Sequence, residues 1–137
     1  MQTAELRRRF AASPVAHLAT VRPDGRPHVV PMVFALVNDT VYSAVDAKPK
    51  RSQRLQRVTN VRENPRCALL VDHYDDDWRR LWWVRADGRC DVVEEPSLAH
   101  PGIEALVQRF RQYIDDPPAG PLLVVSVHHW TGWAASP

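Results

Sequence analysis

Residues 15–34 read VAHLATVRPDGRPHVVPMVF, and this stretch decides the fold. Its mostly apolar ends predict two strands, over residues 15–21 and 28–36. Between them, proline presets one backbone dihedral and Asp24-Gly25 favours the left-handed one, so residues 22–26 predict a tight turn. Pro31 predicts an edge position or a bulge in the second strand, because proline cannot donate a hydrogen bond to a neighbouring strand. The chain therefore opens with an antiparallel hairpin.

The rest of the sequence continues this pattern of strands with few helices. Further strands are expected over 41–45, 67–71, 81–94 and 122–130 or 122–133, and helices over 3–12, 52–63 and 98–113. Thr3 can cap the first helix, and Asp87-Gly88 predicts a bulge or bend in the long strand. The helices do not alternate with the strands, which argues against a parallel doubly wound sheet. We predict a mainly β fold with flanking helices, a six-stranded antiparallel barrel formed by one domain spanning residues 1–137.

Composition excludes several classes of protein. The 137 residues are 45% apolar and 25% charged, which is ordinary for a folded domain. A net charge of +2 gives no bulk attraction to nucleic acid or to a membrane surface. No apolar run approaches the roughly 20 residues of a membrane helix, and Ser13, Pro14 and His17 interrupt any signal-peptide core. We expect a cytoplasmic protein whose two cysteines, Cys67 and Cys90, are free thiols.

The two lysines of the chain lie together. Of 18 basic residues only Lys48 and Lys50 are lysine, and both precede a helix that Ser52 is expected to cap. Arg51 and Arg54 add two more cations at this helix start, which is already partially positive and normally attracts acidic residues. The cluster predicts a phosphate site, where backbone N–H groups and ammonium groups converge on one anion. The alternative is a solvated basic loop.

The second strand offers a surface beside this cluster. Along Pro31, Met32, Val33 and Phe34 the side chains should alternate, with Met32 and Phe34 on one face and Pro31 and Val33 on the other. A flat aromatic cofactor could lie along this backbone, held by main-chain hydrogen bonds. The alternative is that these residues are plain barrel core.

Five tryptophans exceed what one small core needs. Trp82 and Trp83 are adjacent on a predicted strand and must face opposite sides, so one of them requires another cover. Trp78, Trp130 and Trp133 add further large aromatic side chains. A cofactor ring or a partner chain would cover them, and we expect a homodimer.

Other motifs point to no metal and no covalent nucleophile. His128 and His129 are adjacent on a strand and cannot grip one ion. Asp75-Asp76-Asp77 lacks the glycine and the distal glutamate of a calcium loop, so a solvated turn is expected. The chain holds no Gly-rich phosphate loop, no GxSxG motif and no Cys/His pair at catalytic spacing.

Residues 16–31, AHLATVRPDGRPHVVP, resemble the opening of the pyridoxamine 5′-phosphate oxidase-like flavoproteins, the FMN-binding split-barrel family. Further segments are similar to the branch of deazaflavin (coenzyme F420)-dependent oxidoreductases: DAKPKR at 46–51, NPR at 64–66, LVDHYD at 70–75, Trp78 and LWWVR at 81–85. The likeness covers nearly the whole chain. Its first third is generic to the superfamily, whereas the lysine segment and the tryptophan stretch are specific to the branch.

The resemblance implies a homodimer of split barrels with two cofactor sites at the interface. In such proteins a basic cluster after the third strand holds the cofactor phosphate, which here would be Lys48, Lys50 and Arg51. The middle of the second strand, residues 31–34, would lie beside the ring. The partner chain often contributes an aromatic residue, for which the candidates are Trp78, Trp82 and Trp133. Such sites often place a hydroxyl near the phosphate, though not always the same one, and Ser52 is the candidate here.

The resemblance also implies an activity, in which a reduced deazaflavin passes a hydride to a small electron-poor substrate. No side chain is identified as catalytic, although His73 and Tyr74 are candidate proton donors. F420 carries an oligoglutamate tail, for which Arg54, Arg57 and Arg79-Arg80 offer cations. The nearest alternative is an FMN-dependent oxidoreductase of the same fold. A non-catalytic cofactor- or haem-binding barrel and a nucleic-acid-binding barrel are further alternatives, and the near-neutral charge disfavours the last.

Overall fold

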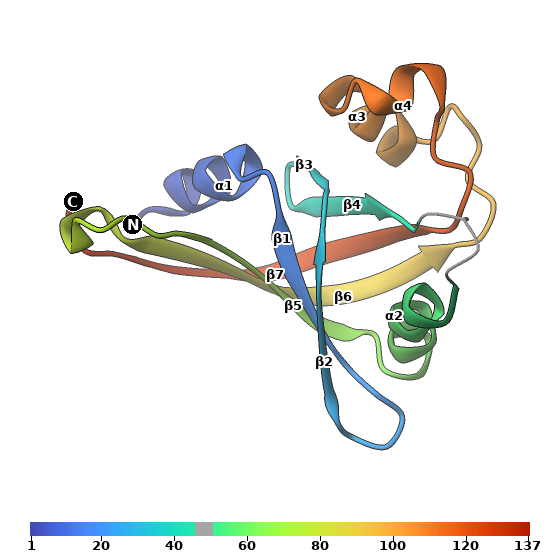
Figure 1. The fold of residues 1–137 in the computed structure, drawn as a ribbon, viewed down its shortest axis with the longest axis horizontal. Helices are drawn as coiled ribbons and strands as arrows, with labels where there is room; N and C mark the ends of the chain where they lie inside the picture. Colours follow the sequence, from blue (N-terminus) through green and yellow to red (C-terminus); the bar gives the residue numbers. More distant parts are fainter. Residues whose placement is uncertain (46–50) are drawn as a thin grey trace.

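The computed structural model describes residues 1–45 and 51–137, with residues 51–55 described by their backbone alone. Seven antiparallel strands form one sheet in the order β2-β1-β5-β6-β7-β4-β3 (Figure 1). The strands are β1 (Ala16–Val21), β2 (Pro27–Met32), β3 (Ala35–Val37), β4 (Thr40–Ala44), β5 (Arg66–His73), β6 (Trp82–Val93) and β7 (Leu122–Ala134). The helices are α1 (Thr3–Ala12), α2 (Arg51–Glu63), the short 3-10 helix η1 (Trp78–Arg80), α3 (Pro101–Arg109) and α4 (Gln112–Asp115).

The sheet curls until its two edges nearly meet. β2 lies at one edge and β3 at the other, yet only Val33 and Phe34 separate them in the chain. Met32 and Ala35 are three residue steps apart and so lie within about 11 Å of each other, which means that the edges must approach. β2 pairs with β1 alone and β3 with β4 alone, so the barrel is left open at this point. The prediction of a mainly antiparallel sheet with flanking helices is confirmed.

The structure has seven strands rather than six because the expected strand 28–36 is divided. The carbonyls of Val33 and Phe34 accept hydrogen bonds from the side chains of Ser43 and Arg109. Side-chain bonds to these two carbonyls interrupt the ladder at this point. The edge position expected from Pro31 is confirmed, since β2 is an edge strand.

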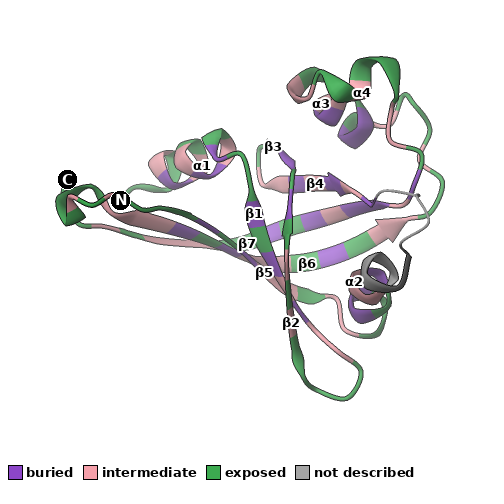
Figure 2. Ribbon diagram, viewed as in Figure 1, coloured by how far each residue is buried: buried purple, intermediate pink, exposed green. Residues whose placement is uncertain are grey.

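The core fills the inside of the curl. Its largest fully buried side chains include Phe10, Leu18, Phe34 and Leu69. Figure 2 shows buried and exposed residues alternating along the strands, as expected when one face of a sheet is packed. A smaller cluster lies under α3, where Ile103 and Leu106 pack on Ala35 and Leu122.

Both ends of α3 and the N-cap of α1 differ from the prediction. The helix expected over 98–113 begins only at Pro101, where the His100 side chain caps it by accepting from the Gly102 N–H. It ends at Arg109, because Phe110 has extended backbone angles, and α4 follows as a separate short helix. At α1 the N-cap is Gln2 rather than Thr3, and its side chain makes no capping bond.

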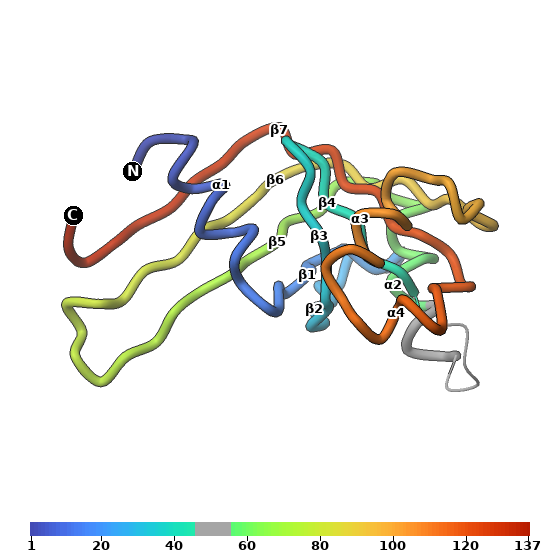
Figure 3. Tube along the Cα trace, turned by 90° about the horizontal axis from the view of Figure 1, so that it is seen from above, coloured from blue at the N-terminus to red at the C-terminus, as the bar shows by residue number. Residues whose placement is uncertain are grey.

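β5, β6 and β7 extend well beyond the barrel. The expected bulge is confirmed, because the β6–β7 register shifts between Asp87 and Gly88. Past it, the three strands run on as a long arm, with α1 along it and η1 at its tip (Figures 1 and 3). In the described part of the chain, no helix has the length and apolar character needed to cross a bilayer.

Candidate functional site

The break between β2 and β3 is held by two side chains from other elements. Ser43 Oγ on β4 donates to the Val33 carbonyl at 2.8 Å. Arg109 on α3 donates from Nη1 to the Phe34 carbonyl at 2.7 Å and from Nη2 to the Ser13 carbonyl at 2.6 Å. The Arg109 guanidinium also lies over the Phe34 ring, 4.8 Å from its centroid. The backbone at the open edge of the barrel is therefore fixed in place.

The side chains at this edge alternate as predicted. Met32 and Phe34 are buried in the core, whereas Pro31 and Val33 are exposed. Phe34 has no exposed surface at all, so neither it nor Met32 offers its side chain to a bound ring. What this stretch can offer is the exposed Val33 side chain and the backbone of an edge strand, whose outward groups have no strand partner.

The last described residue before the basic segment lies near this edge. Lys48 and Lys50 lie outside the described residues. Val45, the last described residue before them, is two residues beyond Ser43, so it lies within about 7 Å of the residue bonded to Val33. On the other side of the segment α2 begins at Arg51, which places Ser52 and Arg54 inside the helix by their backbone. Ser52 is therefore in the first turn and not in the predicted capping position.

Two consecutive side-chain hydrogen bonds connect α2 to β1. Gln56 Nε2 donates to Asn60 Oδ1 at 2.7 Å, and Asn60 Nδ2 donates to Thr20 Oγ1 at 3.0 Å. Val58 and Val61 of this helix are buried. The position of the helix start is thus set by contacts within the first hairpin.

Two arginines, Arg22 on the hairpin and Arg57 on α2, lie near His28. Burial lowers the pKa of His28, and the nearby cations Arg22 and Arg57 lower it further. His28 is therefore neutral near pH 7 in the folded chain. The arrangement favours an anion near this end of α2.

The arm separates the candidate tryptophans. Trp82 packs against the core, its ring stacked on His73 at 5.9 Å and covered by the Arg9 guanidinium at 5.1 Å. Trp83 points to the opposite face, where its direct neighbour across the strands is Trp133. Trp78 on η1 is 68% exposed and Trp133 is 47% exposed. Trp78 and Trp133 therefore present the most surface to another molecule.

The outward face of the sheet is apolar too. Around His17 lie Val29, Leu70 and Trp83, and together with Ala19, Ala68, Asp72 and Arg85 they line a shallow hollow of about 530 Å³. Val29 is 60% exposed and Leu70 is 40% exposed. A sheet with one face in water normally carries polar residues there. The apolar outward face could have been predicted from the sequence, because apolar residues occupy both alternating sets of positions along residues 67–71.

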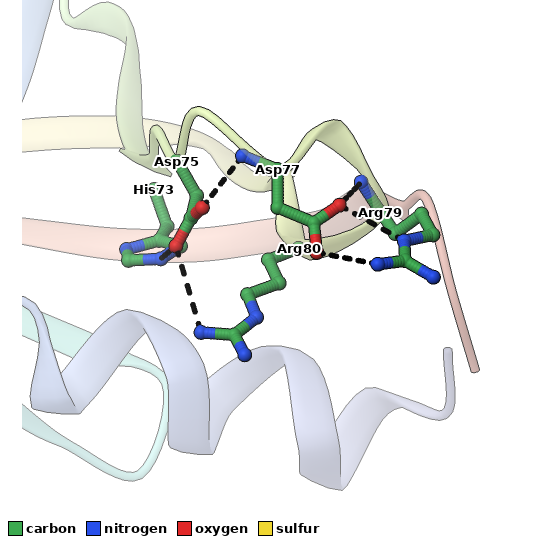
Figure 4. A network of polar contacts seen from close by, with 5 residues as sticks. All are labelled: His73, Asp75, Asp77, Arg79 and Arg80. Atoms are coloured by element: carbon green, nitrogen blue, oxygen red, sulfur yellow. Dashed lines mark hydrogen bonds and ion pairs between the residues drawn. The ribbon is translucent and has the colours of Figure 1, made fainter.

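The remaining polar candidates lie at the arm. Tyr74 is exposed, and His73 Nε2 lies 4.0 Å from Asp75. Asp75 accepts from the Asp77 N–H, and Asp77 holds Arg79 through two oxygens, so these acids form the solvated turn that was predicted (Figure 4). No group of three metal-ligating side chains occurs among residues 1–45 and 56–137.

The cysteines are not reactive thiols. Both are free, and burial raises the pKa of Cys67 and of Cys90 to about 12. At neutral pH they stay protonated, which leaves them poor nucleophiles.

The family model for pyridoxamine 5′-phosphate oxidase matches residues 2–134. The chain belongs to this family. Among solved structures, the conserved hypothetical protein Rv2991 of Mycobacterium tuberculosis is 24% identical, with a TM-score of 0.78 over 98% of this chain and 86% of that one. A FAD-binding protein from Mesorhizobium loti is 20% identical, with a TM-score of 0.73 over 96% and 92% of the two chains.

A third solved structure widens the range of ligands on this fold. The haem storage protein HutZ of Vibrio cholerae is 17% identical, with a TM-score of 0.71 over 96% of this chain and 93% of that one. No curated protein sequence matches the chain. The solved structures that share this fold with the chain therefore include a FAD-binding protein and a haem storage protein.

Proposed function

We propose that the protein is an oxidoreductase that binds coenzyme F420 between two copies of the chain and reduces a small electron-poor substrate. The observation that carries the proposal is the Ser43–Val33 hydrogen bond. It joins the open edge of the barrel to the end of β4, from which the segment with Lys48 and Lys50 continues. An edge for a ring and cations for a phosphate then belong to one site.

The edge strand and the basic segment together suit such a cofactor. The edge backbone of β2 can bond a planar heterocycle, and the exposed Val33 can contact it. Lys48, Lys50, Arg51 and Ser52 would hold the phosphate at the start of α2. Arg22 and Arg57 extend the positive potential, which suits the acidic tail of F420 better than the single phosphate of FMN.

We propose a homodimer that forms through the outward face. The outward face exposes apolar surface to water, which is unfavourable; this surface is formed by the exposed Val29 and Leu70 and the half-buried Trp83. Arg85 and Asp87 lie on the same face, so two copies related by a two-fold axis could pair opposite charges. The arm would then extend past its own barrel to the partner, carrying Trp78 with it.

In this proposal the protein binds and orients but supplies no covalent step. Bound F420 would supply the hydride. The edge at Val33 and Phe34, fixed by Ser43 and Arg109, would set the tilt of the ring. The apolar outward face of the partner would exclude water from the reacting carbon.

The cofactor can be identified by titrating the protein with F420, FMN and haemin in turn, following the quenching of tryptophan emission. Tight F420 binding and weak FMN binding are expected. The reverse order would make this an FMN protein. Tight haemin binding with a Soret band, and no binding of either flavin, would overturn the redox proposal in favour of haem binding.

The phosphate site is tested by replacing its two lysines. Lys48→Ala with Lys50→Ala should weaken F420 binding more than tenfold, because each charge-assisted hydrogen bond contributes about 1.5–3 kcal/mol. The control is Arg26→Ala with Arg66→Ala, which removes the same charge from exposed positions of the first turn and β5. Equal F420 affinity of the two double variants would show that the lysine segment is only a solvated loop.

A further inference from the structure

A second basic site lies far from the lysine segment in the chain, at the arm. A groove of about 640 Å³ separates α1 from the turn between β5 and β6. Arg8 and Arg9 line it from α1, and Arg79 and Arg80 line it from η1. Figure 4 shows the Arg80 side chain directed toward the α1 ribbon. Two pairs of cations thus face each other across one groove.

Each wall pairs with acids of its own side. On α1, Arg8 lies 3.7 Å and Arg9 lies 3.4 Å from Glu5. These distances exceed the 2.7–2.9 Å or so of a charge-assisted hydrogen bond, so both guanidinium groups keep donors free for another acceptor.

The opposite wall repeats the pattern. Arg79 is held by Asp77 at 2.9 Å, whereas Arg80 lies 3.9 Å from Asp75. The ion pairs that these four arginines make stay on their own wall. Like charges facing each other across a gap repel, and an anion between them would remove the repulsion.

We propose that this groove binds an oligocarboxylate, with Arg8 and Arg80 as its principal contacts. These two side chains are 71% and 72% exposed and are the most loosely paired of the four. A guanidinium fork matches a carboxylate, and two forks on opposite walls require two carboxylates on one ligand. Arg9 is partly engaged by Trp82 and Arg79 by Asp77, so both contribute charge more than contacts.

One acid limits the ligands that fit. Asp72 also lines the groove, at its β5 wall near His73. It repels an anion placed there and so directs the carboxylates toward the α1 and η1 walls. The ligand should therefore span these two walls and leave the β5 wall to solvent.

Oligocarboxylates could reach the groove from two sources. One is a free small molecule, and the other is the oligoglutamate tail of F420, which rests on the function proposed above. The probes are tri-γ-glutamate alone, glutamate-free F420 and oligoglutamylated F420, each titrated by calorimetry at low ionic strength.

The test variant is Arg8→Gln with Arg80→Gln, and the matched control is Arg26→Gln with Arg66→Gln. We expect tri-γ-glutamate to bind the wild type and the control, and to bind the test variant at least tenfold more weakly. Unchanged unfolding midpoints in urea show that the variants fold. A tail source predicts that only the test variant loses its preference for oligoglutamylated F420. If the ligand is instead a free small molecule, tri-γ-glutamate binding should be unaffected by saturating oligoglutamylated F420.

The proposal is overturned if tri-γ-glutamate does not bind the wild type, or if the control loses as much affinity as the test variant. The peptide titration uses no cofactor. Failure of the protein to bind F420 would therefore contradict the proposed function and leave this groove standing.

Discussion

Arg109 shows how much one side chain can determine at the open edge. Its guanidinium donates to the carbonyls of Phe34 and Ser13 and lies over the Phe34 ring. Arg109→Met keeps the apolar stem and removes both bonds, so we expect a loss of about 2–4 kcal/mol in the free energy of unfolding. Urea denaturation measures it. Arg111→Met, an exposed change two residues away, should alter stability by less than about 0.5 kcal/mol.

Equal stability of the two arginine variants would contradict this role. Local patterns could predict which side chains at the edge are buried, and Met32 and Phe34 follow the period of a strand. They could not predict Arg109, because its acceptors lie 75 and 96 residues away in the chain. Pairing at such distances is decided by the tertiary fold and leaves no periodic signal.

At the scale of elements, the β6–β7 bulge depends on one glycine. A Cβ on Gly88 would lie 2.2 Å from the backbone oxygen of Ser126, and a carbonyl in a paired strand cannot move aside. Gly88→Ala should therefore cost about 2–3 kcal/mol of unfolding free energy. Gly25→Ala has open space around its Cβ and a φ of +89°, so only backbone strain of about 1 kcal/mol is expected. Thermal unfolding of the two variants, compared with the wild type, decides the order.

A smaller cost at Gly88 than at Gly25 would mean that the bulge can relax. Sequence could predict the bulge itself, since Asp87-Gly88 places a glycine inside a long strand pattern. The division of the expected strand 28–36 could not be predicted from the sequence, because it is imposed by the side chains of Ser43 and Arg109 on other elements. The early end of α3 at Phe110 likewise has no breaker residue in the sequence to mark it.

At the scale of the whole molecule, turns and alternation were enough to predict a mainly antiparallel sheet with flanking helices. The opening between the two edges was not predictable, because it depends on β2 and β3 lying at opposite edges of one sheet. The candidate site contains one feature that the sequence predicts and one that depends on a tertiary contact. Its edge strand follows from Pro31 and the first hairpin, whereas the contact between that edge and the end of β4 depends on a single bond between Ser43 and Val33.

The outward face yields the prediction that tests the assembly. Leu70→Glu places a charge at the centre of the apolar hollow, beside His17 and Arg85 in the neighbouring strands. If two copies meet there, burying that charge is costly, so the variant should sediment as a monomer and bind F420 at least tenfold more weakly. Val37→Glu is the control, since Val37 is 44% exposed at the opposite edge of the sheet. A wild-type monomer, or a Leu70→Glu dimer with normal F420 affinity, would show that the cofactor site does not need this face.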